Sequence, residues 1–357
     1  MKRRIGILTS GGDCPGLNAA IRGVALASYH LFNAEFVGIA DGFQGLIDGD
    51  YREMKPEDFH GLLTLGGTIL GTRRTPYRNM RKIEDDQVDK VASMKKNYKK
   101  MNLDCLITLG GNGTHKTANL LSEEGLNVIG LPKTIDNDIW GTDVTFGFHT
   151  AVDLATEVID RIHTTANSHG RVMVIEIMGN KAGWLTLYSG VAGGADVVLL
   201  PEIPYSIDKV IESVEKRTNK NRKFTIIALA EGAFSKDVAK MKRKDRLASI
   251  QEAGFSSNSY MLADRIQQAT GLETRVVVPG HYLRGGSPSP YDRLLATQFG
   301  VYGAQLIKDE NYGQTVAMIN GRIGHNALSE VAGITKFVPV DHQVVRAAKD
   351  MGITFGD

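Results

Sequence analysis

The sequence is short of cysteine, of net charge and of long apolar runs, and each shortage excludes a class of protein. Two cysteines in 357 residues, Cys14 and Cys105, are too few for a disulfide framework, so a reducing, cytoplasmic location is expected. The 42 basic and 40 acidic residues leave a net charge of +2, which predicts no nucleic-acid partner. No apolar run approaches the roughly 20 residues of a membrane span, so no membrane association is expected.

Apolar runs of strand length alternate with segments of helix length along the chain. This alternation predicts an α/β fold in which helices cover both faces of a mostly parallel sheet. The predicted strands are residues 4–9, 36–40, 105–109, 127–131, 171–177, 197–200, 224–229 and 274–278, and helices are predicted at 150–164, 207–217 and 259–270. The chain is long enough for two lobes with cores of their own, although its composition marks no boundary between them.

Two carboxylates, Asp136 and Asp138, follow the largely apolar run 126–131. Such a run is typical of a short buried strand, and open α/β sheets bind ligands at the carboxyl ends of their strands. There, one carboxylate can take a proton from an attacking hydroxyl while the other holds Mg²⁺ or positions the site. An Asx-rich turn without chemistry is the alternative interpretation of the same residues.

Gly-rich turns follow two other predicted strands. Gly11 and Gly12 precede a helix expected to begin near Leu17, and residues 110–113 precede a helix expected at 115–124. Glycine lets the backbone approach an anion closely, and the helix that follows directs its free N–H groups to the same place. Neither turn is a dinucleotide fingerprint or a Walker A loop, and either alone is also compatible with a simple tight connection. The three strand ends together indicate a polyphosphate site.

The chain resembles the phosphofructokinase family in a series of segments that occur in the family's order. They lie between residues 9 and 293 and read TSGGDCPGLN, GGTILGTRR, GGNGT, PKTIDND, IEIMGNKAGW, LAEGA and GHYLRGGSPSPYDR. The resemblance implies transfer of a phosphoryl group from ATP, with Mg²⁺, to the 1-hydroxyl of fructose 6-phosphate in glycolysis. It also implies two Rossmann-like three-layer lobes with the active site in the cleft between them. The donor lobe would hold residues 1–147 with 284–334, and the sugar-phosphate lobe 148–283 with 335–357.

The resemblance assigns the catalytic and donor-binding roles to the strand ends described above. Asp136 matches the general base, Asp138 supports its geometry, Thr134 contacts the transferring group, and Arg74 bridges the donor phosphates and the incoming hydroxyl. The residues that match donor-phosphate positions are Gly12, Arg74, Thr75, Gly111, Asn112, Gly113 and Thr114.

The sugar-phosphate site is implied by a second set of matches. Its members are Thr134, Ile135, Asp136, Arg171, Met178, Gly179, Asn180, Glu231, Arg275, His281 and Arg284. Guanidinium and imidazole groups suit a phosphate dianion, and Glu231 matches the carboxylate that binds the sugar hydroxyls. Family architecture brings Arg171 and Arg275 from a neighbouring subunit, which implies a homodimer or homotetramer with shared active sites.

Three positions bear on the metal and on the donor. Asn112 stands where most of the family has a metal-binding carboxylate, and its amide oxygen can still ligate Mg²⁺ without adding charge. Gly113 leaves open the space that an aspartate fills in members that use pyrophosphate, which favours ATP. Lys133 favours pyrophosphate, because pyrophosphate-dependent members of the family carry lysine there. The sequence therefore predicts ATP as the donor, with pyrophosphate as the alternative.

Some interpretations stay open at this stage. Phe43 either offers an aromatic face to a nucleotide or packs in the core. Arg22 matches one arginine of the usual bacterial effector site, but the second is replaced by Leu26, so effector control is expected to be weak or absent. An inactive nucleotide-binding protein would not need both Asp136 and Asp138. Diacylglycerol and NAD kinases share the Gly-rich loop but lack the HYLRGGSP segment.

Overall fold

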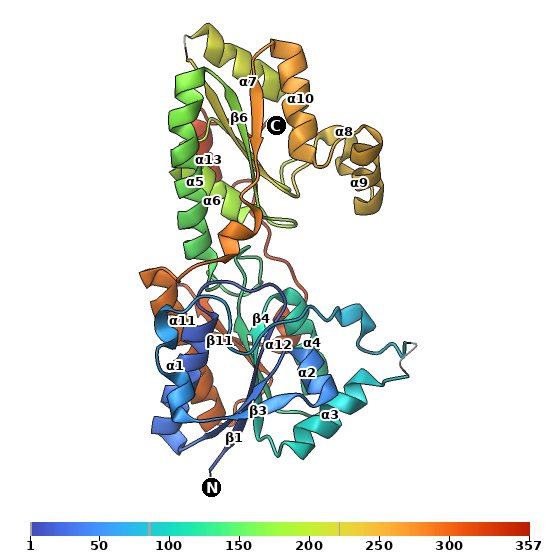
Figure 1. The fold of residues 1–357 in the computed structure, drawn as a ribbon, viewed down its shortest axis with the longest axis vertical. Helices are drawn as coiled ribbons and strands as arrows, with labels where there is room; N and C mark the ends of the chain where they lie inside the picture. The colour runs from blue at the N-terminus through green and yellow to red at the C-terminus, as the bar shows by residue number, and fades with distance from the viewer. Residues whose placement is uncertain (1, 85–86, 221) are drawn as a thin grey trace. The chain divides into compact units, whose positions relative to one another are not determined.

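The computed structural model describes residues 2–84, 87–220 and 222–357, which form two compact units (Figure 1). Unit 1 comprises Met1–Thr150 and Arg284–Lys336, and unit 2 comprises Ala151–Leu283 and Phe337–Asp357. The chain therefore passes between the units three times. Strands and helices alternate in both, and the predicted α/β class is confirmed.

Unit 1 is built on a seven-stranded sheet in the order β11-β10-β5-β4-β1-β2-β3. The five central strands run parallel, and the edge strands β3 and β11 run antiparallel to their neighbours. Every residue of β4 is buried, as expected for a parallel strand that is covered on both faces. The bounds are β1 Arg4–Ser10, β2 Glu35–Ile39, β3 Tyr51–Met54, β4 Cys105–Gly110, β5 Val128–Pro132, β10 Gln314–Ile319 and β11 Arg322–Ala327.

Helices cover both faces of this sheet (Figure 1). On one face α1 and α11 pack closely, because Gly300 brings the α11 backbone against Ala20 and Val24 with no room for a Cβ atom. On the other face α2, α3, α4 and α12 enclose an apolar cluster that includes Phe43. The bounds are α1 Leu17–Phe32, α2 Phe43–Asp48, α3 Lys90–Lys100, α4 Asn112–Glu123, α11 Pro290–Lys308 and α12 Leu328–Val331, with short 3₁₀ turns η1 Pro56–Phe59, η2 Leu62–Thr64 and η3 Tyr77–Asn79.

Unit 2 contains a four-stranded parallel sheet in the order β7-β8-β6-β9. Helices α5, α6 and α13 lie on one face, and α7 and α10 lie on the other (Figure 1). The strands are β6 Val172–Ile177, β7 Val197–Leu199, β8 Thr225–Ala230 and β9 Thr274–Val277. The helices are α5 Phe148–His169, α6 Trp184–Ala192, α7 Ile207–Asn219, α8 Lys236–Ala239, α9 Arg243–Glu252, α10 Asn258–Thr270 and α13 Gln343–Asp350, with a 3₁₀ turn η4 at Gly280–Arg284.

The predicted strands are confirmed to within one residue at each end, but other predictions need correction. The helix predicted at 115–124 begins earlier, at Asn112, because the Gly-rich turn itself forms the first turn of α4. Phe43 is fully buried in the apolar cluster of unit 1, so the core interpretation is right and a role beside a nucleotide is excluded. The strands β3, β10 and β11 were not predicted.

Candidate active site

The three strand ends that carry the sequence motifs meet at one edge of the unit 1 sheet. Strands β5, β4 and β1 are consecutive neighbours and run parallel, so their carboxyl ends lie side by side. A pocket of about 330 Å³ opens there. It is lined by Ser10, Gly11, Gly12, Arg74, Thr75, Pro76, Tyr77, Gly111, Asn112, Gly113, Thr114, Lys133, Thr134, Asp136, Asp138 and Arg284.

The amino end of α4 forms one wall of this pocket. Gly111 is the N-cap residue and no side chain caps the helix, so the first backbone N–H groups, from Asn112 onwards, are left for a ligand. Gly113 faces open space, with no atom within 4 Å of the position a Cβ would take. The Thr114 hydroxyl donates to the Ser10 carbonyl over 3.4 Å, which links the start of α4 to the end of β1. This arrangement is suited to holding an anion.

His115 fastens the Gly-rich turn to the sheet from behind. Its Nε2 lies 2.8 Å from the Thr315 hydroxyl of β10, and its Nδ1 lies 3.1 Å from the Gly111 carbonyl. The ring is fully buried, and this burial lowers the pKa of His115 to about 4. The native state therefore holds a neutral imidazole, whereas the unfolded chain takes up a proton near pH 6.5.

We expect this difference to make stability depend on pH. The contribution of neutral His115 is fully present above pH 6.5 and is lost as the pH falls towards 4, which amounts to at most ~3 kcal/mol in the free energy of unfolding. Urea unfolding at pH 7 and at pH 4.5 measures this loss. The variant His115→Gln, which cannot titrate, should show a smaller loss than wild type. Equal losses in the two proteins would contradict the assignment.

Two cationic side chains hold the Gly11–Gly12 turn. The Lys133 ammonium is buried and donates a hydrogen bond to the Gly12 carbonyl, and burial lowers the pKa of Lys133 below its usual value. The Arg284 guanidinium donates to the Asp13 carbonyl over 3.0 Å and lies against Gly12, where a Cβ atom would approach it to 2.8 Å. Arg284, which the sequence assigned to the sugar phosphate, thus lies in the same pocket as the donor-phosphate residues.

The loop after β5 carries the two carboxylates. Thr134 shapes it, since its hydroxyl accepts a hydrogen bond of 3.0 Å from the Asp136 backbone N–H. The side-chain amide of Asn112 donates to the carbonyl and to the carboxylate of Asp138, at 3.0 and 3.2 Å. Ile135 is fully buried, so only its main chain is left to contact a ligand.

Oxygen ligands for a hard cation are present in this loop. Within the described residues no cluster of three or more His, Cys, Asp or Glu side chains could hold a metal alone. However, the buried Oδ1 of Asn112 has no hydrogen-bond partner among the described residues, and the Nδ2 of the same amide donates to the Asp138 carboxylate. One amide oxygen and one carboxylate fit Mg²⁺, which keeps several water or phosphate ligands of its own.

The remaining predicted sugar-phosphate residues lie in unit 2, at two opposite ends of its sheet. Met178, Gly179 and Asn180 directly follow β6 and Glu231 directly follows β8, so these four mark the carboxyl end. At the same end the Gly232 N–H donates to the Gly179 carbonyl over 3.2 Å.

Arg171 and Arg275 mark the amino end of the same sheet. Arg171 precedes β6, and Arg275 pairs with Met173 near the start of that strand. A strand of six residues separates the two ends by ~20 Å, so within one unit 2 these arginines do not meet the other group. Both bind the carboxylate of Glu273, Arg171 at 2.6 Å, which leaves one positive charge in excess. His281 is exposed on the turn η4.

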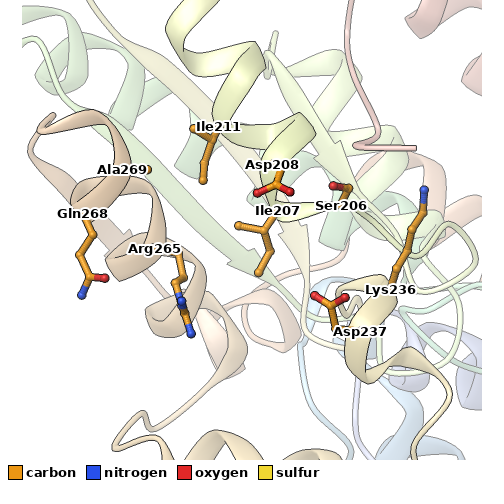
Figure 2. A pocket seen from close by; sticks show the side chains of 9 residues that line it. All are labelled: Ser206, Ile207, Asp208, Ile211, Lys236, Asp237, Arg265, Gln268 and Ala269. Atoms are coloured by element: carbon orange, nitrogen blue, oxygen red, sulfur yellow. The ribbon is translucent and has the colours of Figure 1, made fainter.

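Sequence reasoning missed the residues that complete the pocket wall. Pro76 and Tyr77 line the pocket beside Thr75, and their position directly after the Arg73-Arg74 pair was the available signal. A larger pocket, of about 570 Å³, lies in unit 2 between α7, α8 and α10 (Figure 2). The charged side chains that line this pocket carry both signs and are Asp208, Lys236, Asp237 and Arg265. None of the predicted site residues lines it. We assign no function to it.

Gly-rich turns beside a carboxylate pair, at the ends of adjacent parallel strands, are the arrangement expected of a phosphoryl-transfer enzyme of the α/β class. Residues 4–307 match the family model described as Phosphofructokinase. The chain belongs to the phosphofructokinase family, as the sequence predicted.

Curated relatives match nearly the full length of the chain. It is 54% identical to an ATP-dependent 6-phosphofructokinase of Spirochaeta thermophila, covering 99% of this chain and 98% of that one. It is 44% identical to a pyrophosphate–fructose 6-phosphate 1-phosphotransferase of Amycolatopsis methanolica, covering 94% and 96%. A crystal structure of Pichia pastoris phosphofructokinase in the T-state superposes with a TM-score of 0.80 at 30% identity, over 99% of this chain and 37% of that chain.

None of the helices within the described parts of the chain is long and apolar enough to cross a membrane.

Proposed function

We propose that this chain transfers the terminal phosphoryl group of ATP to the 1-hydroxyl of fructose 6-phosphate, giving fructose 1,6-bisphosphate in glycolysis. The observation that carries the proposal is the pocket of unit 1, where the uncapped amino end of α4 and the Gly11–Gly12 turn lie beside Asp136. The 54% identity to an ATP-dependent 6-phosphofructokinase supports it. Coupled turnover of fructose 6-phosphate, with ATP and with pyrophosphate side by side, tests it.

The pocket residues divide the work of phosphoryl transfer, which is chiefly positioning and neutralisation of charge. The N–H groups at the start of α4 hold the donor phosphates, and Arg74 neutralises them, while Arg284 in the same pocket binds the sugar phosphate. Asp136 accepts the proton of the attacking hydroxyl, and Thr134 orients that carboxylate through the loop. Asn112 and Asp138 would hold Mg²⁺, which when bound offsets the charge that develops on the phosphates. Unit 1 thus serves the donor and the attacking hydroxyl, and unit 2 supplies the other residues assigned to the sugar phosphate.

Gly113 favours ATP over pyrophosphate. No protein atom lies within 4 Å of the position that a Cβ atom would take at Gly113, which lines the pocket, so the glycine leaves space for a larger donor. A pyrophosphate-dependent reaction is the second candidate, and two observations favour it. They are Lys133, whose buried ammonium donates to the Gly12 carbonyl, and the similarity to a pyrophosphate-using relative.

Because Gly113 leaves space for the nucleotide, wild type should turn over faster with ATP than with pyrophosphate. Faster turnover with pyrophosphate would select the alternative.

We further propose a homodimer or homotetramer in which subunits share active sites. Arg171 and Arg275 lie ~20 Å from Gly179 and Glu231 along the same sheet, which is too far for one sugar phosphate to touch both groups. The Arg275 side chain is largely exposed and available to a second molecule. In this proposal each arginine pair completes the sugar-phosphate site of a neighbouring subunit.

Shared sites predict complementation between inactive variants. Asp136→Asn removes the base and Arg275→Ala removes the phosphate contact, so each homo-oligomer should be nearly inactive. When the two are mixed under conditions of subunit exchange, hybrid sites with both groups intact should restore a measurable fraction of wild-type turnover. Exchange is verified separately by mass spectrometry of differently tagged subunits. Exchange without recovered turnover would contradict sharing through Arg275.

A cytoplasmic location completes the proposal. Cys14 and Cys105 are both free and buried, in agreement with a reducing compartment. We also propose that the enzyme responds weakly or not at all to phosphate-bearing effectors. Leu26, one helical turn after Arg22, is partly exposed on α1 and cannot bind a phosphate.

A further inference from the structure

The segment between the two catalytic carboxylates turns through a residue with a left-handed backbone. Asn137 has φ at 49°, a conformation that asparagine adopts more readily than most residues other than glycine. Its side chain holds the turn closed, because Oδ1 accepts a hydrogen bond of 3.1 Å from the Thr145 N–H and Nδ2 donates to the Asp143 carbonyl over 3.3 Å. The relative placement of Asp136 and Asp138 therefore depends on what keeps Asn137 in place.

Lys336, nearly 200 residues further along the chain, donates hydrogen bonds to this segment. The ammonium of Lys336, the last residue of unit 1, donates to Asn137 Oδ1 at 3.0 Å and to the carbonyls of Thr142 and Asp143 at 2.8 and 3.0 Å. Its backbone N–H donates to the Asp138 carbonyl over 2.8 Å. One side chain thus uses all three of its donors on a single loop.

The local environment keeps this contact strong. Thr335 forms a bridge with Ile139, which fixes the backbone that presents Lys336. The carboxylates of Asp143 and Asp138 attract the ammonium, although burial lowers the pKa of Lys336 to about 8. Hydrogen bonds donated by an ammonium group are stronger than those between neutral groups.

We propose that Lys336 is a positioning residue for phosphoryl transfer, which acts through Asn137 to hold Asp136 and Asp138 in their reactive arrangement. This inference rests on the proposed function and deepens it. Lys336 touches neither substrate. Its effect is on the geometry of the carboxylate loop, where a displacement of an ångström is enough to cost ~10²-fold in rate.

The test compares Lys336→Met with Lys90→Met as a matched control. Lys336 is half-buried, whereas Lys90 is a buried lysine of unit 1. Lys90 donates to the carbonyl of Lys82 and to the carboxylate of Glu84, but it lies on α3 outside the pocket. Lys336→Met should lower kcat 10- to 100-fold with KM for ATP within about 3-fold of wild type. Lys90→Met should retain wild-type kcat. Equal kcat in Lys336→Met and wild type would overturn the proposal.

Two further measurements separate positioning from loss of stability. If Lys336 acts through Asn137, the kcat of the double variant Lys336→Met/Asn137→Ala should equal that of Asn137→Ala alone, whereas independent effects would multiply. Hydrogen exchange at the Thr145 amide, which bonds to Asn137, should speed up in Lys336→Met and not in Lys90→Met. Multiplying effects, or unchanged exchange at Thr145, would overturn the proposal. Wild-type turnover tests the proposed function separately, and the exchange measurement needs no turnover.

Discussion

Replacing Asp136 by asparagine should lower kcat by at least ~10²-fold, the usual loss when a general base is removed. The side chain lines the pocket between Thr134 and Asp138, where an incoming hydroxyl must give up its proton. Asparagine keeps the shape and the backbone hydrogen bond to Thr134 but cannot accept that proton. KM for both substrates should change little, so the loss should appear in kcat.

Asp104→Asn is the control for this variant. Asp104 precedes β4 at the amino end of the same sheet, opposite the pocket, and its carboxylate accepts a hydrogen bond from the Arg4 N–H over 2.7 Å. This substitution should leave kcat near wild type. Steady-state kinetics of both variants measure kcat, and thermal unfolding shows whether each variant keeps the stability of wild type. A kcat for Asp136→Asn within a few-fold of wild type would rule out Asp136 as the base.

Introducing aspartate at Gly113 should reduce kcat/KM for ATP by two orders of magnitude or more. The position lies in the first turn of α4, with φ in the ordinary helical range and open space around it, so the fold should tolerate the side chain. The new carboxylate would occupy the space expected for the α-phosphate of ATP. It would both clash with the nucleotide and repel its phosphates. Activity with pyrophosphate should fall less than activity with ATP, or rise.

Gly113→Asn and Gly113→Ala separate shape from charge. Asparagine has the size of aspartate without its charge, so equal losses for the two variants would indicate exclusion by volume. Alanine adds a single methyl group and should reduce ATP use least. The ratio of kcat/KM for ATP to that for pyrophosphate is the quantity to compare. A ratio unchanged in Gly113→Asp would remove Gly113 from the argument about donor choice.

Local sequence patterns were sufficient for the sheet and for the convergence of the pocket. Strands β1, β4 and β5 are short apolar runs that end in glycine or in polar residues, and parallel strands necessarily bring such ends to one edge. Asp136, Gly12 and Gly113 could therefore be placed together from the sequence. The order of the strands in the sheet was not predicted, because no pattern in the sequence indicates that β10 returns beside β5.

The features that were missed depend on a turn or on long-range contacts. Strands β10 and β11 form a hairpin whose two-residue turn, Asn320-Gly321, has positive φ at both positions, and an Asn-Gly pair is a strong hairpin signal that could have been used. Helix α4 begins three residues earlier than predicted because Asn112 and Gly113, which were interpreted as part of the turn, form its first turn after the N-cap Gly111. Nothing near Lys336 in the sequence indicates its contact with Asn137, since that contact exists only once the chain has folded back.

The three passages of the chain between its units have a consequence for biosynthesis. Strand β10 pairs with β5, and helix α11 packs on α1, so the first half of unit 1 emerges from the ribosome without the elements that cover it. Unit 2 likewise lacks α13 until the end of translation. Its sheet, from β6 to β9, is complete earlier and can form first. The Asp136 loop is held by Lys336, near the C-terminus, so a nascent chain cannot present a finished pocket before its synthesis is almost over.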